Sequence, residues 1–140
     1  MIQRFCLFLL LLGLSSPTFS QMMEEFLWFN FEDVSLHGVL NMPESGAPKG
    51  IVLIVHGPGR TDAINQNLHG DIRQTLVQAG YATYMWDKMG SGKSEGPFDY
   101  NQPVQNSAEE VLAAIDMLKT KEIPGSEEMR RAITTSKKVS

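Results

Sequence analysis

The stretch WDKMGSGKSEG, Trp86–Gly96, holds residues that two different chemistries would use. Gly92-Lys93-Ser94 matches the end of a loop that wraps nucleotide phosphates with backbone N–H groups. The five residues from Gly92 to Gly96 also spell G-x-S-x-G, the tight turn that presents a nucleophilic serine for acyl transfer. One segment cannot perform both tasks, so the surrounding sequence has to decide between them.

The phosphate-binding interpretation fails on the residues at both ends of the motif. The full pattern needs a glycine five positions before Gly92, and that position holds Asp87, whose carboxylate would repel phosphate. A helix should start directly after Ser94, but Glu95-Gly96-Pro97 follows instead. The sequence therefore predicts no nucleotide partner.

The nucleophile interpretation fails on order and spacing. The preceding strand is expected to end near Asp87, well before Ser94, and no helix follows. In folds that use this turn, the histidine base comes after the serine. The three histidines, His37, His56 and His69, all precede Ser94. We therefore interpret Asp87, Gly90, Gly92 and Ser94 as a structural glycine loop that lets the chain turn sharply after a strand.

The N-terminal residues differ from the rest of the chain. Arg4, a short apolar run and the small residues before Gln21 predict a signal peptide over residues 1–20, cleaved after Ser20, and a secreted or periplasmic protein. The alternative is an uncleaved membrane anchor, which would be the chain's one link to a membrane. Cys6 is the single cysteine, so disulfides and thiolate metal sites are not expected. A net charge of -4 argues against nucleic-acid binding.

Periodicity predicts the elements that position these loops. Strands are expected over residues 25–32, 34–44, 51–55 and 81–87, and helices over 67–79 and from Ser107 onward. The first helix should bury Leu68, Ile72, Leu76 and Ala79; the second should bury Ala108, Val111, Leu112, Ile115 and Leu118.

Two details of these elements are specific enough to test. Ser107 and Glu110 form a capping box. The apolar run 51–55 predicts a central parallel strand that is covered on both faces. The element order gives an α/β class with an incomplete parallel sheet, whose last edge would be open.

Taken together, GIVLIVHGPGRTD and AGYATYMWDKMGSGKSEG, each followed by a helix, resemble the N-terminal half of the α/β-hydrolase superfamily. The resemblance is to its serine-aminopeptidase-like and acyl-esterase-like branch, and it covers about residues 33–128. It implies a hairpin followed by β-α-β-α, in a partial domain over residues 21–128. Residues 129–140 are expected to be an unrelated or disordered tail. Asp87 is expected to order the glycine loop by accepting backbone N–H bonds.

The resemblance also implies an oxyanion loop at His56, Gly57, Pro58, Gly59 and Arg60. Its first donor would be the residue after Gly57, but Pro58 has no N–H, so either Gly59 or Arg60 donates or the hole is impaired. An Arg60–Asp62 pair that braces the loop is favoured over a substrate contact. His56 is expected to orient the loop, whereas His37 and His69 are expected on the surface, without a metal.

The resulting hypothesis is the N-terminal fragment of a secreted serine hydrolase that acts on ester or peptide bonds. The intact relative would take a small-molecule or peptide substrate and no cofactor. No residue of this chain is assigned as catalytic, because the nucleophile, acid and histidine of the family fall beyond the resemblance, so the chain alone is expected to be inactive. The alternative is a small exported binding protein that uses the half-fold without catalysis.

Overall fold

The first described element is an antiparallel hairpin of two long strands, β1 (Met22–Phe31) and β2 (Val34–Pro43). The computed structural model describes residues 22–99, 101 and 104–123. The predicted signal peptide, residues 1–20, and the predicted tail, residues 129–140, lie outside them. The aromatic and alternating apolar patterns of residues 25–44 correctly predicted both strands.

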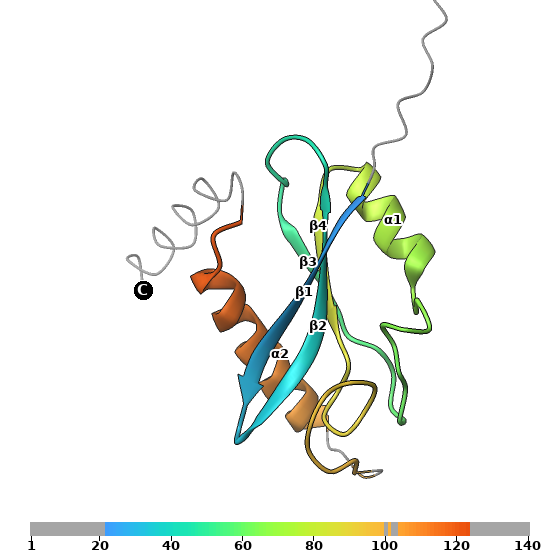
Figure 1. Ribbon diagram of the computed structural model, residues 1–140, viewed down its shortest axis with the longest axis vertical. Coiled ribbons are helices and arrows are strands. Elements are labelled where there is room, and N and C mark those ends of the chain that lie inside the picture. The colour runs from blue at the N-terminus through green and yellow to red at the C-terminus, as the bar shows by residue number, and fades with distance from the viewer. Residues whose placement is uncertain (1–21, 100, 102–103, 124–140) are drawn as a thin grey trace, which may run out of the picture.

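The next strands complete a four-stranded mixed sheet. β3 (Ile51–Ile54) pairs in parallel with β4 (Ala82–Trp86), and β4 pairs antiparallel with β2. The order is β1-β2-β4-β3, so β1 and β3 are the two outer strands. Helices α1 (Gly70–Gln78) and α2 (Val104–Thr120) lie on opposite faces of this sheet (Figure 1). In the described part of the chain, no helix is long and apolar enough to cross a membrane.

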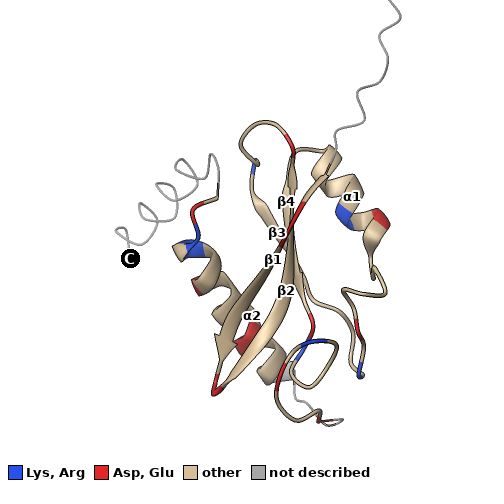
Figure 2. Cartoon of the chain, viewed as in Figure 1, with Lys and Arg blue, Asp and Glu red and all other residues tan. Residues whose placement is uncertain are grey.

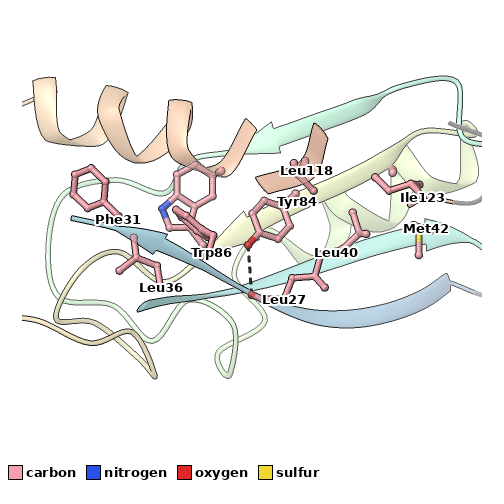
Figure 3. Packing of buried hydrophobic residues seen from close by; sticks show 12 residues of the cluster. Leu27, Phe31, Leu36, Leu40, Met42, Tyr84, Trp86, Leu118 and Ile123 are labelled. Atoms are coloured by element: carbon pink, nitrogen blue, oxygen red, sulfur yellow. Dashed lines mark hydrogen bonds between the residues drawn. The ribbon is translucent and has the colours of Figure 1, made fainter. Parts of the chain in front are cut away.

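The main core fills the space between the sheet and α2. Aromatic and aliphatic side chains from β1, β2 and β4 meet Ala114 and Leu118 of α2 there. Tyr84 and Trp86 lie at its centre, and the Tyr84 hydroxyl donates to the Leu27 carbonyl at 3.5 Å (Figure 3). Burial raises the pKa of Tyr84, which keeps its hydroxyl neutral. A smaller cluster around Val39 and Met85 packs on the α1 side.

The prediction that residues 51–55 form a central, fully covered strand is wrong for the described sheet. All four residues of β3 are only partly buried, and Val55 is exposed. The strand is apolar and parallel to β4 as expected, but its other edge pairs with no described strand. The half-buried state follows directly from this outer position.

The predicted buried face of the first helix is wrong in part: Leu68 packs against the smaller cluster and Leu76 is half-buried, but Ala79 is exposed. Ile72 is exposed, and α1 buries Arg73 and Val77 instead. Arg73 faces the sheet because its guanidinium donates to Asn41 of β2 at 2.7 Å and also to Asn67. This polar network sets the rotation of α1, and apolar periodicity alone could not predict it.

Helix α2 begins at Val104, so Ser107 is not its N-cap and the predicted capping box does not form. The residues that α2 buries most deeply are Glu110, Ala114 and Leu118. Leu112, expected on the buried face, is 62% exposed. The helix is rotated because Glu110 reaches into the sheet, where polar groups receive it.

Candidate functional site: the loops after β3 and β4

The candidate site consists of two loops at the same end of the sheet. The first, here called the oxyanion loop, is His56–Arg60, and the second, the glycine loop, is Asp87–Gly96. Parallel β3 and β4 both run toward this end, which brings the two loops together. In α/β sheets this is the edge where ligands bind.

His56 connects the two loops through both ring nitrogens. Its ring is buried, with Nδ1 3.0 Å from the Gly57 carbonyl oxygen and Nε2 3.4 Å from the Lys88 backbone nitrogen. A carbonyl can only accept and a backbone N–H can only donate, so Nδ1 carries the proton and Nε2 accepts. Burial lowers the pKa of His56, and the positive charge of Lys88 lowers it further, whereas the bond to Gly57 opposes the shift. This neutral ring orients the oxyanion loop and contacts no serine in the described residues.

The rest of the oxyanion loop faces solvent with free donors. Residues 57–60 are exposed. Pro58 has no N–H, and the backbone N–H groups of Gly59 and Arg60 donate to no atom of the described residues. Gly59 has φ 114°, and a Cβ added there or at Gly57 would meet no atom within 4 Å. The loop thus carries unpaired N–H groups on an exposed stretch, and unpaired donors are what an anionic oxygen requires.

The predicted Arg60–Asp62 brace does not form: among the described residues no ion pair joins the two side chains. Asp62 instead accepts from the Asn65 backbone at 3.3 Å and from its side-chain amide at 2.8 Å. An aspartate three residues before a backbone N–H makes a local turn that competes with a longer-range ion pair.

Asp87 is the centre of the glycine loop and is fully buried. Its Oδ1 accepts the backbone N–H groups of Ala63 at 2.8 Å and Ile64 at 3.3 Å, and its Oδ2 accepts that of Lys93 at 3.3 Å. Gly92 has φ 52°, and a Cβ there would lie 2.2 Å from Oδ2. One carboxylate therefore ties the glycine loop to the segment that follows the oxyanion loop.

Ser94 uses its hydroxyl within the same loop. Its Oγ donates to the Asp87 carbonyl at 2.5 Å and accepts the His37 backbone N–H at 2.8 Å. The side chain is buried and has no imidazole partner. The hydroxyl therefore braces β2 against the loop and is not an activated nucleophile. The Lys93 Nζ lies 5.9 Å from the ring centroid of Phe26, where it makes a cation–π contact and does not face a phosphate-sized nest.

His37 corrects the sequence prediction most clearly, because it is 3% exposed and not a surface residue. Its ring packs against Phe26 and Trp28, with centroids 5.4 and 4.7 Å away. Its Nδ1 lies 3.6 Å from Asp87 Oδ2. The aromatic pair covers it from the neighbouring strand, and this strand pairing is what the linear sequence hid. His69 is exposed, as expected.

Sequence reasoning missed a polar network that attaches α2 to the glycine loop. The buried Glu110 carboxylate accepts Trp86 Nε1 at 2.9 Å and the Met89 N–H at 3.4 Å. Lys88 Nζ donates to Ser107 Oγ at 3.0 Å. The two residues taken as a capping box thus hold the loop. The signal in the sequence was that Glu110 lies four and eight residues before Ala114 and Leu118, on the same helical face.

The described residues contain no group of three or more His, Cys, Asp or Glu side chains arranged to hold a metal ion. The arrangement offers free backbone donors on one loop and a rigid, hydrogen-bonded loop beside it.

Comparison with known proteins gives one family and a set of similar solved structures. The family model described as serine aminopeptidase, S33, matches residues 46–131, more than half of the chain. No curated protein sequence matches the chain.

Three solved structures illustrate the structural likeness. Est1E from Butyrivibrio proteoclasticus, with bound ferulic acid, shares 22% identity and a TM-score of 0.55, over 69% of this chain and 38% of that chain. An esterase from Pyrococcus furiosus shares 18% identity and a TM-score of 0.56, over 72% and 37%. An aminopeptidase from a marine sediment Thaumarchaeota archaeon shares 18% identity and a TM-score of 0.54, over 87% and 21%. The chain thus spans less than half of the length of each, and the likeness establishes the fold.

Proposed function

Because the chain belongs to the serine aminopeptidase S33 family, we propose that it is the N-terminal half of a secreted serine hydrolase that cleaves ester or peptide bonds. The fold expectation is confirmed: the described residues form part of an α/β-hydrolase fold with an incomplete sheet. The predicted leader at residues 1–20 supports export. The names of the similar structures include both an esterase and an aminopeptidase, which supports keeping both bond types.

The observation that carries the proposal is the pair of free N–H groups at Gly59 and Arg60. In acyl transfer, negative charge develops on the substrate carbonyl oxygen, and fixed backbone donors stabilise it. Pro58 removes the donor that the family resemblance would place first, so the donor moves one or two residues along the exposed loop. His56 fixes the carbonyl of Gly57, which leaves this loop little freedom to turn its donors away.

The same structure argues that the described residues do not supply the nucleophile. Ser94 is the one serine in a G-x-S-x-G pattern, and both roles of its hydroxyl are already used. Within the described residues no serine hydroxyl bonds a histidine ring. We therefore assign the chain the scaffold and the oxyanion loop, with no turnover of its own and with neither cofactor nor nucleotide. The triad would come from the longer remainder that the similar structures possess.

Two measurements test this proposal. The purified full chain, with Ser94→Ala as its matched control, is incubated with a fluorophosphonate probe and with a p-nitrophenyl ester. We expect neither protein to be labelled or to hydrolyse the ester. Labelling or turnover that Ser94→Ala abolishes would contradict the assignment.

The second measurement is the DNA sequence of the gene beyond codon 140. A frame that continues into an apolar strand, a second G-x-S-x-G, an aspartate and a histidine is expected. The joined protein should then hydrolyse the ester, and its oxyanion loop should be needed for the rate. If no frame supplies these residues, the hydrolase proposal fails and the non-catalytic binding protein becomes the better interpretation.

A further inference from the structure

The outer edge of β1 is long and regular. All ten residues from Met22 to Phe31 pair with β2 in one continuous register without a bulge. β1 is the last strand of the sheet, so in the described part of the chain no strand pairs with its other edge. Half of its backbone donors and acceptors therefore point outward, which is a template for adding another strand.

This edge lacks three of the features that normally prevent strand addition. Natural edge strands carry lysine, proline or a bulge, and β1 has none of the three. Its charges, Glu24 and Glu25, are confined to the N-terminal half, and the following six residues, FLWFNF, are uncharged. Figure 2 shows this division, with one acidic stretch on β1 followed by an uncharged strand and an acidic turn at its end.

The face of β1 toward the α1 side presents two large aromatic rings to solvent. Phe26 is 53% exposed and Trp28 is 49% exposed. Both are supported from behind by the buried His37 ring. On the opposite face, Leu27 and Phe29 are buried in the main core. The exposed rings therefore lie on a rigid strand, where aromatic side chains contribute most when a partner covers them.

We propose that the β1 edge binds the β1 edge of a second copy of this chain, antiparallel, so that the two sheets become one. Two identical strands related by a two-fold axis perpendicular to the sheet give a closed, self-complementary interface. Residues that lie directly opposite each other in a sheet have their side chains on the same face. The two-fold axis must therefore pass beside one residue of β1 and not between two residues. An axis at Leu27 places Phe26 opposite Trp28 of the second copy, and this aromatic pair occurs twice.

Charge selects this register over its neighbour. With the axis at Leu27, Glu24 lies opposite Asn30 of the second copy, and no carboxylate faces another. With the axis at Trp28, Glu24 would approach the acidic turn residue Glu32 that follows β1 of the second copy, and Phe26 would lie opposite Asn30, so both Phe26–Trp28 pairs would be lost. An axis at Phe26 would place Trp28 opposite Glu24 of the second copy, so both Phe26–Trp28 pairs would be lost. The occupant is therefore a second β1 in the Leu27 register, and this inference does not depend on the hydrolase proposal.

The first experiment measures the mass of the full chain in solution by light scattering after size-exclusion chromatography. We expect a dimer that Trp28→Lys and Phe26→Lys each convert to a monomer, because lysine on an edge strand prevents pairing. Val55→Lys is the matched control, since Val55 is an exposed apolar residue directly after β3, the opposite outer strand of the sheet. It should leave the dimer intact. A monomeric wild type, or association that the β1 variants do not weaken, would overturn the proposal; the latter result would point to the apolar N-terminal segment or another partner surface.

The second experiment fixes the register and does not rely on destabilising variants. A spin label is placed at Asn30→Cys in a Cys6→Ser background, because Asn30 is exposed and Cys6 is the single native cysteine. In the Leu27 register, position 30 of one copy and position 30 of the other lie six residues apart along the paired strands, about 20 Å. An axis at Trp28 would give about 14 Å and an axis at Phe26 about 27 Å. A distance matching neither this register nor any β1–β1 pairing would refute the interface.

Discussion

The oxyanion loop and the glycine loop follow neighbouring parallel strands, yet they are built in opposite ways. In the glycine loop, the Asp87 carboxylate and the Ser94 hydroxyl are buried and every bond of theirs goes to backbone. In the oxyanion loop, one buried side chain, His56, supports an exposed stretch whose N–H groups are free. The glycine loop is thus a brace, whereas the oxyanion loop keeps unpaired backbone donors on an exposed stretch.

The difference between the two loops shows that a match to a short catalytic motif does not by itself locate a reactive group. In the segment that matches two catalytic patterns, the motif residues Ser94 and Asp87 already use their side-chain oxygens to hold the fold together. The segment that spells no complete catalytic pattern keeps its donors available. Substitutions in the glycine loop should therefore change the free energy of unfolding much more than substitutions in the oxyanion loop. Four measurements can test this difference.

The largest effect is expected for Asp87→Ala. The change leaves the backbone N–H groups of Ala63, Ile64 and Lys93 without their acceptor. At roughly 1–3 kcal/mol for each buried donor, the free energy of unfolding should fall by about 4 kcal/mol or more. Arg60→Ala, in the oxyanion loop, should change it by less than about 0.5 kcal/mol. Urea unfolding followed by circular dichroism measures both, and equal effects would show that the brace is not where we place it.

Next in size is the difference between two glycines that both have positive φ. Gly59→Ala should cost about 1–2 kcal/mol, from backbone strain alone, because space around it is open. Gly92→Ala adds a collision with the Asp87 carboxylate, which should cost about 2 kcal/mol more. Thermal and urea unfolding of the two variants give the comparison. A larger loss at Gly59 would mean that the oxyanion loop is the more constrained of the two.

Ser94→Ala should reduce the free energy of unfolding by about 1–3 kcal/mol, because the His37 N–H loses its acceptor inside the protein. Thr61→Ala is the matched change in the open region: its hydroxyl lies 3.5 Å from the Gly59 carbonyl, and we expect less than about 0.5 kcal/mol. Chemical denaturation distinguishes the two. Should Ser94→Ala prove as mild as Thr61→Ala, the brace function of the hydroxyl would be wrong.

The smallest effect is a pH dependence from His56. Its pKa is lowered in the folded state from the ordinary 6.5, so below pH 6.5 the unfolded chain takes up the proton first. This part of the stability is therefore complete above pH 6.5 and is lost as pH falls toward the folded pKa. His56→Asn should show a shallower fall over this window, measured as unfolding free energy at several pH values. An identical slope in both proteins would show that His56 is not held neutral.

The sequence allowed the elements to be predicted better than their faces. Strand and helix positions follow from local patterns, and all six described elements lie where the periodicity placed them. The predicted buried faces of α1 and α2 were wrong in part, because Arg73 and Glu110 point inward to long-range polar partners. Apolar periodicity considers only hydrophobic residues, so it cannot predict the orientation of a helix whose buried face carries a charged side chain.

The candidate site shows the same limit. The family resemblance singled out the loop from His56 to Arg60, whose role as an oxyanion loop stays a prediction, and the glycine loop could be located from its residues. The burial of His37 could not be predicted from the sequence, because it depends on Phe26 and Trp28, which lie beside it on β1. The hydrogen bonds of Ser107 and Glu110 to the loop after β4 could not be predicted either, because the local pattern assigned both residues to a helix cap.

The two tryptophans of the chain also make it a protein with two independent optical probes. Trp86 is fully enclosed, with its indole N–H bonded to Glu110, whereas Trp28 stands half in water on β1. The enclosed indole should emit at shorter wavelength and resist iodide, and it will respond only when α2 leaves the sheet. The open indole should emit at longer wavelength and be quenched readily unless something covers the β1 edge. A single fluorescence titration can therefore follow the packing of the core and the occupancy of the edge separately, without any label.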